Sequence, residues 1–409
     1  MIHGLLSAAL VGVALLAVAE AGCRWWVRAR SRYYVWPPGS RQEIRLAREV
    51  FPELEPCVRF EINRDGERGG EVPRETTGLY RVLATGGSAV ECFALDQPTS
   101  WPAVLERLLN SPDSLQSVGA SRVHVGNIGR SGVASADLDV IFERVLPQYR
   151  SLDVILIMVG ASDVYHWLEE GAPASRPASL VPELQVFGRH PRKPFGWKPG
   201  GWGLAEVARR LRQGWLRPLE VKERAGLWYA NARRMRAEAT DVRNTMPDAT
   251  VMLQNFEAHF RQVCRRALAH ADRVVVMLQP WFDGDYSPEE VARFWIGGVG
   301  KPWKDSVTTY YSLAVVNGLL DLVQTRAAQV AAELGIRSLN LRNALTQRGR
   351  HYFDHDHYTP AGAEVVAHAV AQALVGVQAP AAAARALGAG HGGRATVATA
   401  GHHLEARGR

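Results

Sequence analysis

Residues 79–88 read LYRVLATGGS, an apolar run that ends in three small residues. Runs of the same kind stand at 123–132 (VHVGNIGRSG), 152–163 (LDVILIMVGASD) and 273–281 (RVVVMLQPW), and IRSLNLR at 336–342 is a fifth candidate. Near-continuous Val, Ile and Leu runs are typical of strands that are buried on both faces of a parallel sheet. We therefore expect an α/β fold with a central parallel sheet of about five strands.

Segments with helical periodicity separate these runs. The first segment follows Ser100 and carries apolar residues at helical spacing, namely Trp101, Val104, Leu105, Leu108 and Leu109. A second apolar stripe extends from Leu253 to Ala267, and a third extends from Leu313 to Val330 and stops near Gly335. Strands that alternate with helices in this way predict a layer of helices on each face of the sheet.

The composition is that of a globular protein. The chain has 409 residues, of which 47% are hydrophobic and 22% charged, so it can bury a full-sized core. Its formal charge is +7, but the basic residues are scattered through helical segments, and we expect no nucleic-acid partner. The four cysteines lie far apart, without the spacing of a zinc site or a disulfide framework. We expect no metal and no cofactor.

The N-terminus carries an uncharged apolar stretch, GLLSAALVGVALLAVA at residues 4–19. At about 1.5 Å per residue, a helix of this length nearly spans the roughly 30 Å of bilayer hydrocarbon. We interpret residues 1–23 as a membrane signal anchor. A cleaved signal peptide and a helix in a soluble core are the alternatives.

Three other segments stand outside the strand–helix alternation. Residues 24–75 are rich in Arg, Pro, Trp and Tyr and are expected to form a membrane-proximal connector, although these aromatics could equally pack on the main domain at 76–378. Within that domain, residues 166–248 form a long basic insertion with several Trp residues, expected to be a cap, an interaction element or helices on a sheet edge. Residues 379–409 have almost no large apolar side chain and are expected to be disordered.

The residues at the strand ends are the candidates for function, because ligands of a parallel α/β sheet bind outside the carboxyl ends of its strands. After the first strand, Gly86 and Gly87 permit a tight turn into Ser88. A serine in this position can be an exposed nucleophile, and backbone N–H groups of the turn can stabilise an oxyanion. We also expect Glu91, just past Ser88, to hold this turn together.

A second candidate cluster lies near the C-terminus in FDHDHYTPAG, where Asp354 precedes His357 by three residues. This spacing lets the carboxylate fold back onto the imidazole and orient it, so that the ring can accept a proton from a serine hydroxyl. Asp356 is the second choice for the carboxylate, because it is adjacent to His357 and would have to turn away from the ring. These residues predict a Ser88–His357–Asp354 site.

Four blocks of the chain, in order, resemble those of the SGNH/GDSL hydrolases: GGSAVE, NIGRSG, GASD and DHDH. The resemblance covers roughly residues 79–375 and implies a flavodoxin-like three-layer αβα sandwich. It implies Ser88 as the nucleophile, His357 as the general base and Asp354 as the acid that orients it. It also implies that Gly132 donates its backbone N–H to the oxyanion hole, together with Ser88.

The sequence departs from the family in its third block, where Ser162 stands in place of an asparagine whose side-chain amide binds the oxyanion. A serine hydroxyl donates a single hydrogen bond from a shorter side chain. We expect Ser162 to act as a weaker oxyanion donor; alternatively, it only caps the strand end beside Asp163. Loss of one such donor costs roughly 2.7–4 kcal/mol of transition-state stabilisation.

These residues predict a membrane-tethered esterase that hydrolyses acyl or acetyl esters of carbohydrate, lipid or small alcohols. An O-acyltransferase acting on an envelope polysaccharide would use the same residues, and a catalytically weak assembly component of an envelope complex is a third reading. The arginines that follow the apolar stretch favour a cytoplasmic domain. Proteins similar to this one act mostly on extracytoplasmic substrates, and we expect the domain on the outer side.

Overall fold

The computed structural model describes residues 2–30, 32–175, 201–215 and 219–375. Five strands form one parallel sheet in the order β10–β8–β5–β3–β4. Their bounds are β3 Leu79–Gly86, β4 Arg122–Asn127, β5 Val154–Met158, β8 Arg273–Leu278 and β10 Arg337–Asn340. These are the five runs expected from the sequence, so that prediction is confirmed. Counted along the chain, the order is 2-1-3-4-5, a doubly wound arrangement whose switch point lies between β3 and β5.

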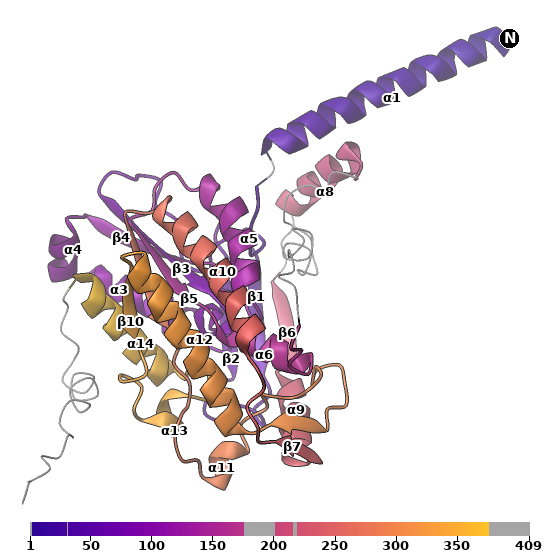
Figure 1. Ribbon diagram of the computed structural model, residues 1–409. Coiled ribbons are helices and arrows are strands. Elements are labelled where there is room, and N and C mark those ends of the chain that lie inside the picture. The colour runs from indigo at the N-terminus through magenta and orange to yellow at the C-terminus, as the bar shows by residue number, and fades with distance from the viewer. Residues whose placement is uncertain (1, 31, 176–200, 216–218, 376–409) are drawn as a thin grey trace, which may run out of the picture.

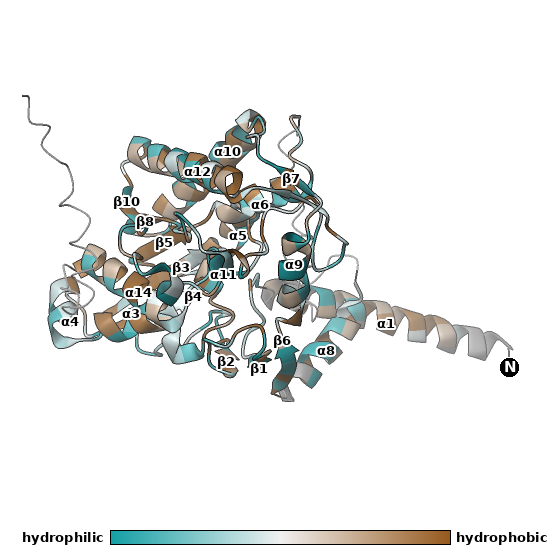
Figure 2. Cartoon of the chain, turned by 90° about the horizontal axis from the view of Figure 1, so that it is seen from below, coloured by the Kyte–Doolittle hydropathy of each residue, from teal (hydrophilic) through white to brown (hydrophobic). Residues whose placement is uncertain are grey.

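Helices cover both faces of this sheet, as Figure 1 and, in a view from below, Figure 2 show. One face carries α3 Trp101–Leu109, α4 Pro112–Val118 and α14 Pro360–Val375. The other carries α5 Ser135–Val145, α6 Ala161–Glu169, α10 Thr250–Leu268 and α12 Leu313–Glu333. The three helices expected from apolar spacing are α3, α10 and α12. Gly335, in the left-handed region with φ of 68°, follows the end of α12 as expected.

The core is centred on β5, the middle strand of the sheet. Each of its side chains, from Val154 to Met158, is at most 1% exposed. Because helices cover both faces, both sets of alternating side chains of this strand are buried. This burial explains why the sequence shows a continuous apolar run here and not an alternating one.

A second, three-stranded sheet forms beside the main one, with the order β2–β1–β6. β1 Arg41–Leu46 and β2 Cys57–Glu61 are antiparallel neighbours, and β6 Glu220–Ala225 pairs with β1 in parallel. Segment 24–75, expected to be a connector, therefore contains two strands. Their inward side chains, among them Ile44 and Phe60, join the main core. Trp36, one of the aromatic residues of this segment, is part of the same core.

Shorter elements complete the described chain. They are the helices α2 Ser88–Glu91, α9 Leu227–Ala237, α11 Pro288–Val291 and α13 Arg348–His351, the 3₁₀ turns η1 Gln97–Thr99 and η2 Leu146–Gln148, and the strand pair β7 Asp241–Arg243 with β9 Thr309–Tyr311. The insertion expected at 166–248 supplies α8 Gly203–Trp215, β6, α9 and β7. Part of that insertion, and the whole tail expected at 379–409, lie outside the described residues.

The N-terminal helix α1, Ile2–Arg30, extends away from the layered body (Figure 1). Its stretch Ala9–Val27 is long and apolar enough to cross a membrane, and most of it is exposed. A signal sequence near the N-terminus would have the same properties. The helix α8 lies beside the part of α1 that is nearer the body, as both views show.

Candidate active site

Ser88 stands at the carboxyl end of β3, next to the switch point of the sheet. The turn into it depends on Gly86, whose φ is 148° and whose Cβ, if it had one, would lie 1.8 Å from the carbonyl oxygen of Met158. Only glycine can occupy this position without displacing the neighbouring strand. The turn leads directly into α2, and Ser88 is its first residue.

Ser88, His357 and Asp354 form a chain of hydrogen bonds. The Nε2 of His357 lies 2.7 Å from the Oγ of Ser88. On the other side of the ring, Nδ1 lies 2.9 and 2.8 Å from the two carboxylate oxygens of Asp354. The structure thus brings together the three residues that the sequence singled out, although 269 positions separate Ser88 from His357.

Asp354 is held in place by several N–H donors. Its Oδ1 accepts from the backbone N–H groups of Asp356 and His357 at 3.1 and 2.9 Å, and Oδ2 accepts from the indole of Trp295 at 3.3 Å. Asp356, the second choice, keeps its Oδ1 3.5 Å from His357 Nδ1 and accepts a hydrogen bond from Gln279. Asp354 is therefore the nearer partner of the ring.

The same side chains of Asp354, Asp356 and His357 are close enough to hold a metal ion. Their surroundings fit an ion poorly. The oxygens of Asp354 already accept hydrogen bonds, and a carboxylate that faces several N–H donors is arranged for an imidazole and not for a cation. The hydrogen-bonded arrangement is the one that the geometry favours.

Burial and charge act in opposite directions on His357. Burial lowers the pKa of the ring, but the negative charges of Asp354 and Asp356 outweigh burial and raise that pKa above its usual 6.5. Burial alone would raise the pKa of Asp354, which is 1% exposed, but the charge and hydrogen bonds of His357 lower it. The site is therefore arranged to stabilise an imidazolium beside a carboxylate.

The loop after β4 brings Gly132 to the same site. Gly129 packs so closely against α2 that a Cβ there would lie 2.6 Å from the backbone nitrogen of Glu91. Gly129 donates its N–H to the side chain of Asn127 at 2.8 Å and accepts from the indole of Trp36 at 2.9 Å. Gly132 itself adopts a left-handed conformation, with φ of 74°. The loop is thus fixed next to Ser88.

Ser162 is the second residue of α6, in the segment that follows β5. Its Oγ lies 3.6 Å from the point that a Cβ on Gly87 would occupy, so the hydroxyl is close to the turn before Ser88. The next residue, Asp163, accepts from the backbone N–H of Ser135 at 3.0 Å and from its hydroxyl at 2.5 Å. Asp163 therefore ties α6 to the start of α5. Burial raises the pKa of Asp163 to about 6.

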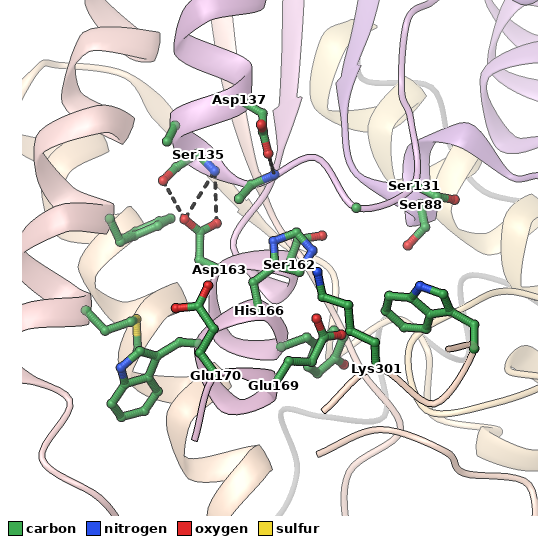
Figure 3. Close-up of a pocket in the computed structure, with 18 of the residues that line it drawn as sticks. Ser88, Ser131, Ser135, Asp137, Ser162, Asp163, His166, Glu169, Glu170 and Lys301 are labelled. Carbon is green, nitrogen blue, oxygen red and sulfur yellow. Dashed lines mark hydrogen bonds between the residues drawn. The ribbon is translucent and has the colours of Figure 1, made fainter. Parts of the chain in front are cut away.

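These residues open into a cavity of about 750 Å³ (Figure 3). Ser88, Gly132, Ser162 and His357 line it, as do Asp163 and Ser135. Figure 3 shows Ser88 on one side of the view and the Asp163–Ser135 pair on the other, with Ser162 between them. Aromatic side chains from α9 and from the loop before β9 form a further wall, namely Trp228, Tyr229, Trp295 and Trp303.

Charged groups also face the cavity. Glu169 and Lys301 both line it. Burial raises the pKa of Glu169 to about 7, although the positive charge of Lys301 acts in the opposite direction. Figure 3 shows both side chains near His166. The cavity therefore combines the hydrogen-bonded pair Ser88 and His357 with aromatic and ionisable groups.

Several residues that position the site were not found from the sequence. Arg68 is buried, and its guanidinium donates to the carbonyl oxygens of Glu91, Cys92 and Leu95 at the end of α2. Nothing in its local pattern marks it, because its partners lie more than 20 positions away. Trp295 on Asp354 and Trp36 on Gly129 are similarly distant contacts.

Comparisons with known proteins add little to this geometry. No protein-family model and no curated protein matches the sequence. Among solved structures, an acetylxylan esterase from Geobacillus stearothermophilus, Axe2, has 14% identity and a TM-score of 0.39, over 73% of this chain and 95% of its own. An alpha/beta hydrolase enzyme from the metagenome of Lake Arreo, LAE5, has 13% identity, with the same TM-score and coverage. Neither family nor activity transfers to this chain at such values.

Proposed function

We propose that the chain is a serine esterase of the SGNH/GDSL type that hydrolyses carboxylic esters. The observation that carries the proposal is the contact of Ser88 Oγ with His357 Nε2 at 2.7 Å, while Asp354 holds the opposite ring nitrogen. A hydroxyl is a weak nucleophile until a positioned base takes its proton. The triad stands at the wall of a cavity large enough for a substrate.

In the first step, Ser88 Oγ attacks the ester carbonyl carbon and His357 Nε2 takes the hydroxyl proton. The negative charge that develops on the carbonyl oxygen is met by the backbone N–H groups of Ser88 and Gly132 and by the hydroxyl of Ser162. His357 then gives its proton to the leaving alcohol, and the acyl group stays on Ser88.

In the second step, water replaces the alcohol. His357 takes a proton from the water, whose oxygen attacks the acyl carbon, and then returns the proton to Ser88 Oγ as the free acid leaves. Asp354 remains ionised throughout and stabilises the imidazolium that forms twice in each cycle. No metal or cofactor enters either step.

The wall of the cavity favours acylated carbohydrate as the substrate. Trp228 lies 5.0 Å from Trp295 and 5.8 Å from Trp303, measured between ring centroids, and these rings meet edge to face at 84° and 72°, so the three form an aromatic surface of crossed rings. The face of a single indole packs well against the C–H face of a sugar ring, while groups such as Glu169 and Lys301 can hydrogen-bond to hydroxyls. A fatty acyl chain would need a more apolar lining.

The location follows from the same proposal. α1 anchors the chain as a single-pass helix, and the esterase domain lies on the outer side, where acylated polymers are found. Protease treatment of intact spheroplasts tests this orientation. Cleavage of the domain while a cytoplasmic marker stays whole supports it, and full protection of the domain contradicts it.

The triad is tested with a fluorophosphonate probe and turnover of 4-nitrophenyl acetate. Ser88→Ala should abolish both labelling and turnover without unfolding the protein, and His357→Ala should do the same, because the base activates the hydroxyl. Ser117→Ala, an exposed serine on α4, is the matched control and should behave like the wild type. Full labelling and turnover in Ser88→Ala would show that the assignment is wrong.

The substrate class is tested at Trp303, which is 41% exposed and stands at the rim of the aromatic surface. Trp303→Ala should lower kcat/KM for an acetylated oligosaccharide by about fivefold, since an aromatic contact contributes on the order of 1 kcal/mol. Turnover of 4-nitrophenyl acetate should stay unchanged. Equal losses on both substrates would argue against a sugar-binding role.

A further inference from the structure

Glu20 is an acidic residue of α1 that directly follows the apolar stretch 4–19, and α8 supplies its partners. Its carboxylate accepts hydrogen bonds from the backbone N–H groups of Gly203 and Leu204 at 2.7 and 3.0 Å. Arg24, one turn further along α1, donates to it at 2.6 Å. Glu20 thus caps the first turn of α8, where free N–H groups attract negative charge.

The two helices also meet through their backbones. A Cβ on Gly203 would lie 2.7 Å from the nitrogen of Arg24 and 3.1 Å from the carbonyl carbon of Cys23. Only a glycine permits an approach this close. α8 is therefore packed directly on the end of the candidate membrane span Ala9–Val27.

α8 is amphipathic. Leu204, Val207, Ala208 and Leu211 follow the spacing i, i+3, i+4, i+7 and form what we term the α8 apolar face. Glu206, Arg209 and Arg210 lie on another side of the helix, where both arginines pair with Glu206 at 2.5 and 2.8 Å. Ala208 and Leu211 leave part of this face open, since both are exposed and Leu211 is 62% exposed, while Leu204 and Val207 are partly buried.

Other large apolar side chains are exposed around this helix. Trp25 on α1 is 73% exposed, and Trp202, just before α8, is 61% exposed. Tryptophan side chains are enriched where a membrane meets water. α8 itself carries one glutamate and three arginines, so its polar side is basic. Basic residues beside an apolar helical face are typical of helices that lie in the interface of an anionic bilayer.

We propose that α8 lies in the membrane interface with its apolar face in the lipid, as a second membrane attachment beside α1. The bond to Glu20 sets its depth, since the start of α8 must lie at the level where α1 leaves the hydrocarbon. The partner is a bilayer with anionic headgroups. This inference rests on α1 remaining in the membrane, and it is independent of ester hydrolysis.

The depth of α8 can be measured in the full-length chain, reconstituted in vesicles of phosphatidylcholine and phosphatidylglycerol. Cys23 and Cys57 are replaced by Ser, while the buried Cys92 and Cys264 are kept. Leu211→Cys is then labelled with an environment-sensitive NBD fluorophore. Arg209→Cys, on the opposite side of α8, carries the same label as the matched control.

The label at position 211 should be quenched by lipids with a spin label near the headgroup and be shielded from aqueous iodide. The label at position 209 should show the reverse, with several-fold stronger iodide quenching. Equal iodide quenching at both positions would overturn the proposal. The proposal would also fail if the difference in iodide quenching between positions 211 and 209 were the same in detergent as in vesicles. Ester turnover measured in the same samples separates this outcome from a failure of the proposed activity.

The contact with α1 is tested by Gly203→Val, whose side chain would collide with the backbone at Arg24. If α1 holds α8 at the interface, the lipid quenching of the label at position 211 should drop at least several-fold in this variant. Unchanged quenching would show that α8 reaches the lipid without α1 and would contradict the depth that Glu20 is proposed to set. Vesicles of phosphatidylcholine alone should weaken the quenching, and no change there would contradict the anionic partner.

Discussion

The carboxylate of Glu91 accepts a hydrogen bond from the backbone N–H of Ser131, so the short helix that begins with Ser88 also holds the loop that contains Gly132. Glu91 is only 3% exposed, and burial raises its pKa. The sequence suggested that Glu91 holds its own turn. In the structure, Glu91 also contacts Ser131, so it connects the segment after β3 to the loop after β4.

Glu91→Ala should lower kcat by up to about 10²-fold, because a loop free to shift by an ångström misplaces the proposed Gly132 donor. KM should change little, since Glu91 does not line the cavity. Glu91→Gln keeps an acceptor for the Ser131 N–H and should recover most of the activity. Equal activity of the Ala and Gln variants would argue that the contact does not position the loop.

The pH profile of kcat/KM should show an acidic limb above pH 6.5. His357 must be neutral to accept the proton of Ser88, and the carboxylates around it raise its pKa, so activity is lost as the pH falls through that raised pKa. Below it, kcat/KM should fall about tenfold per pH unit. Profiles measured with a neutral ester exclude titration of the substrate.

Asp356→Asn should move this limb to lower pH, because it removes one of the negative charges that raise the pKa of His357. The amide can still accept the hydrogen bond from Gln279, so the local packing is conserved. Asp354→Asn is the contrasting variant and should lose most activity at every pH, since the ring loses its orienting carboxylate. A limb that stays in place in Asp356→Asn would show that Asp356 does not act on His357.

His355 should make the protein less stable in acid. Its ring is fully buried, and burial lowers its pKa to about 3. Nε2 lies 2.9 Å from Asn317 Oδ1, and Nδ1 lies 3.2 Å from the hydroxyl of Tyr165, as a neutral ring requires. Between pH 6.5 and 3 the unfolded chain binds a proton that the folded chain does not. The free energy of unfolding therefore decreases by on the order of 1 kcal/mol for each unit by which the pH is lowered.

His355→Gln should flatten this acid dependence, because an amide does not titrate. Chemical unfolding of both proteins in the same detergent at several pH values between 6.5 and 4.5 measures the difference in slope. Carboxylates contribute equally to both proteins and cancel in the comparison. Parallel pH dependences would mean that the ring of His355 is not kept neutral by the fold.

The sheet and the proximity of Asp354 to His357 could be predicted because their signals are local. β5 is buried on both faces and appears in the sequence as an unbroken apolar run, and each parallel strand places the residue after it at the same edge of the sheet. Asp354 and His357 are three positions apart, so their contact needs no knowledge of the fold. Only the contact between His357 and Ser88, which are far apart in the sequence, depended on the predicted topology.

The remaining features depend on contacts between distant segments. Pairing of β1 with β6 joins positions 178 residues apart, as at Gln42 and Glu220, and neither strand carries enough apolar residues to be distinctive. The cap of Glu20 on α8 spans 183 positions. In the sequence, Glu20 only follows the apolar stretch 4–19, and the structure places the N-terminus of α8 beside it.

Ser162 decides how much activity the proposed oxyanion hole can support. Its hydroxyl lies near the turn before Ser88 and lines the same cavity as His357, and for this reason we propose it as a donor to the carbonyl oxygen of the ester. Ser162→Ala should lower kcat and kcat/KM together by about tenfold, the pattern of a contact made only in the transition state. Stopped-flow acylation with 4-nitrophenyl acetate measures this step directly.

Ser162→Asn is the sharper variant, because an asparagine amide reaches further than a serine hydroxyl and has two N–H donors where the hydroxyl has one. The acylation rate should rise by up to about tenfold for each roughly 1.4 kcal/mol gained. Asp163 ties the start of α6 to Ser135, so the backbone at position 162 should stay in place when the side chain changes. If neither variant alters the acylation rate while both fold normally, Ser162 only ends the strand, and another donor meets the oxyanion.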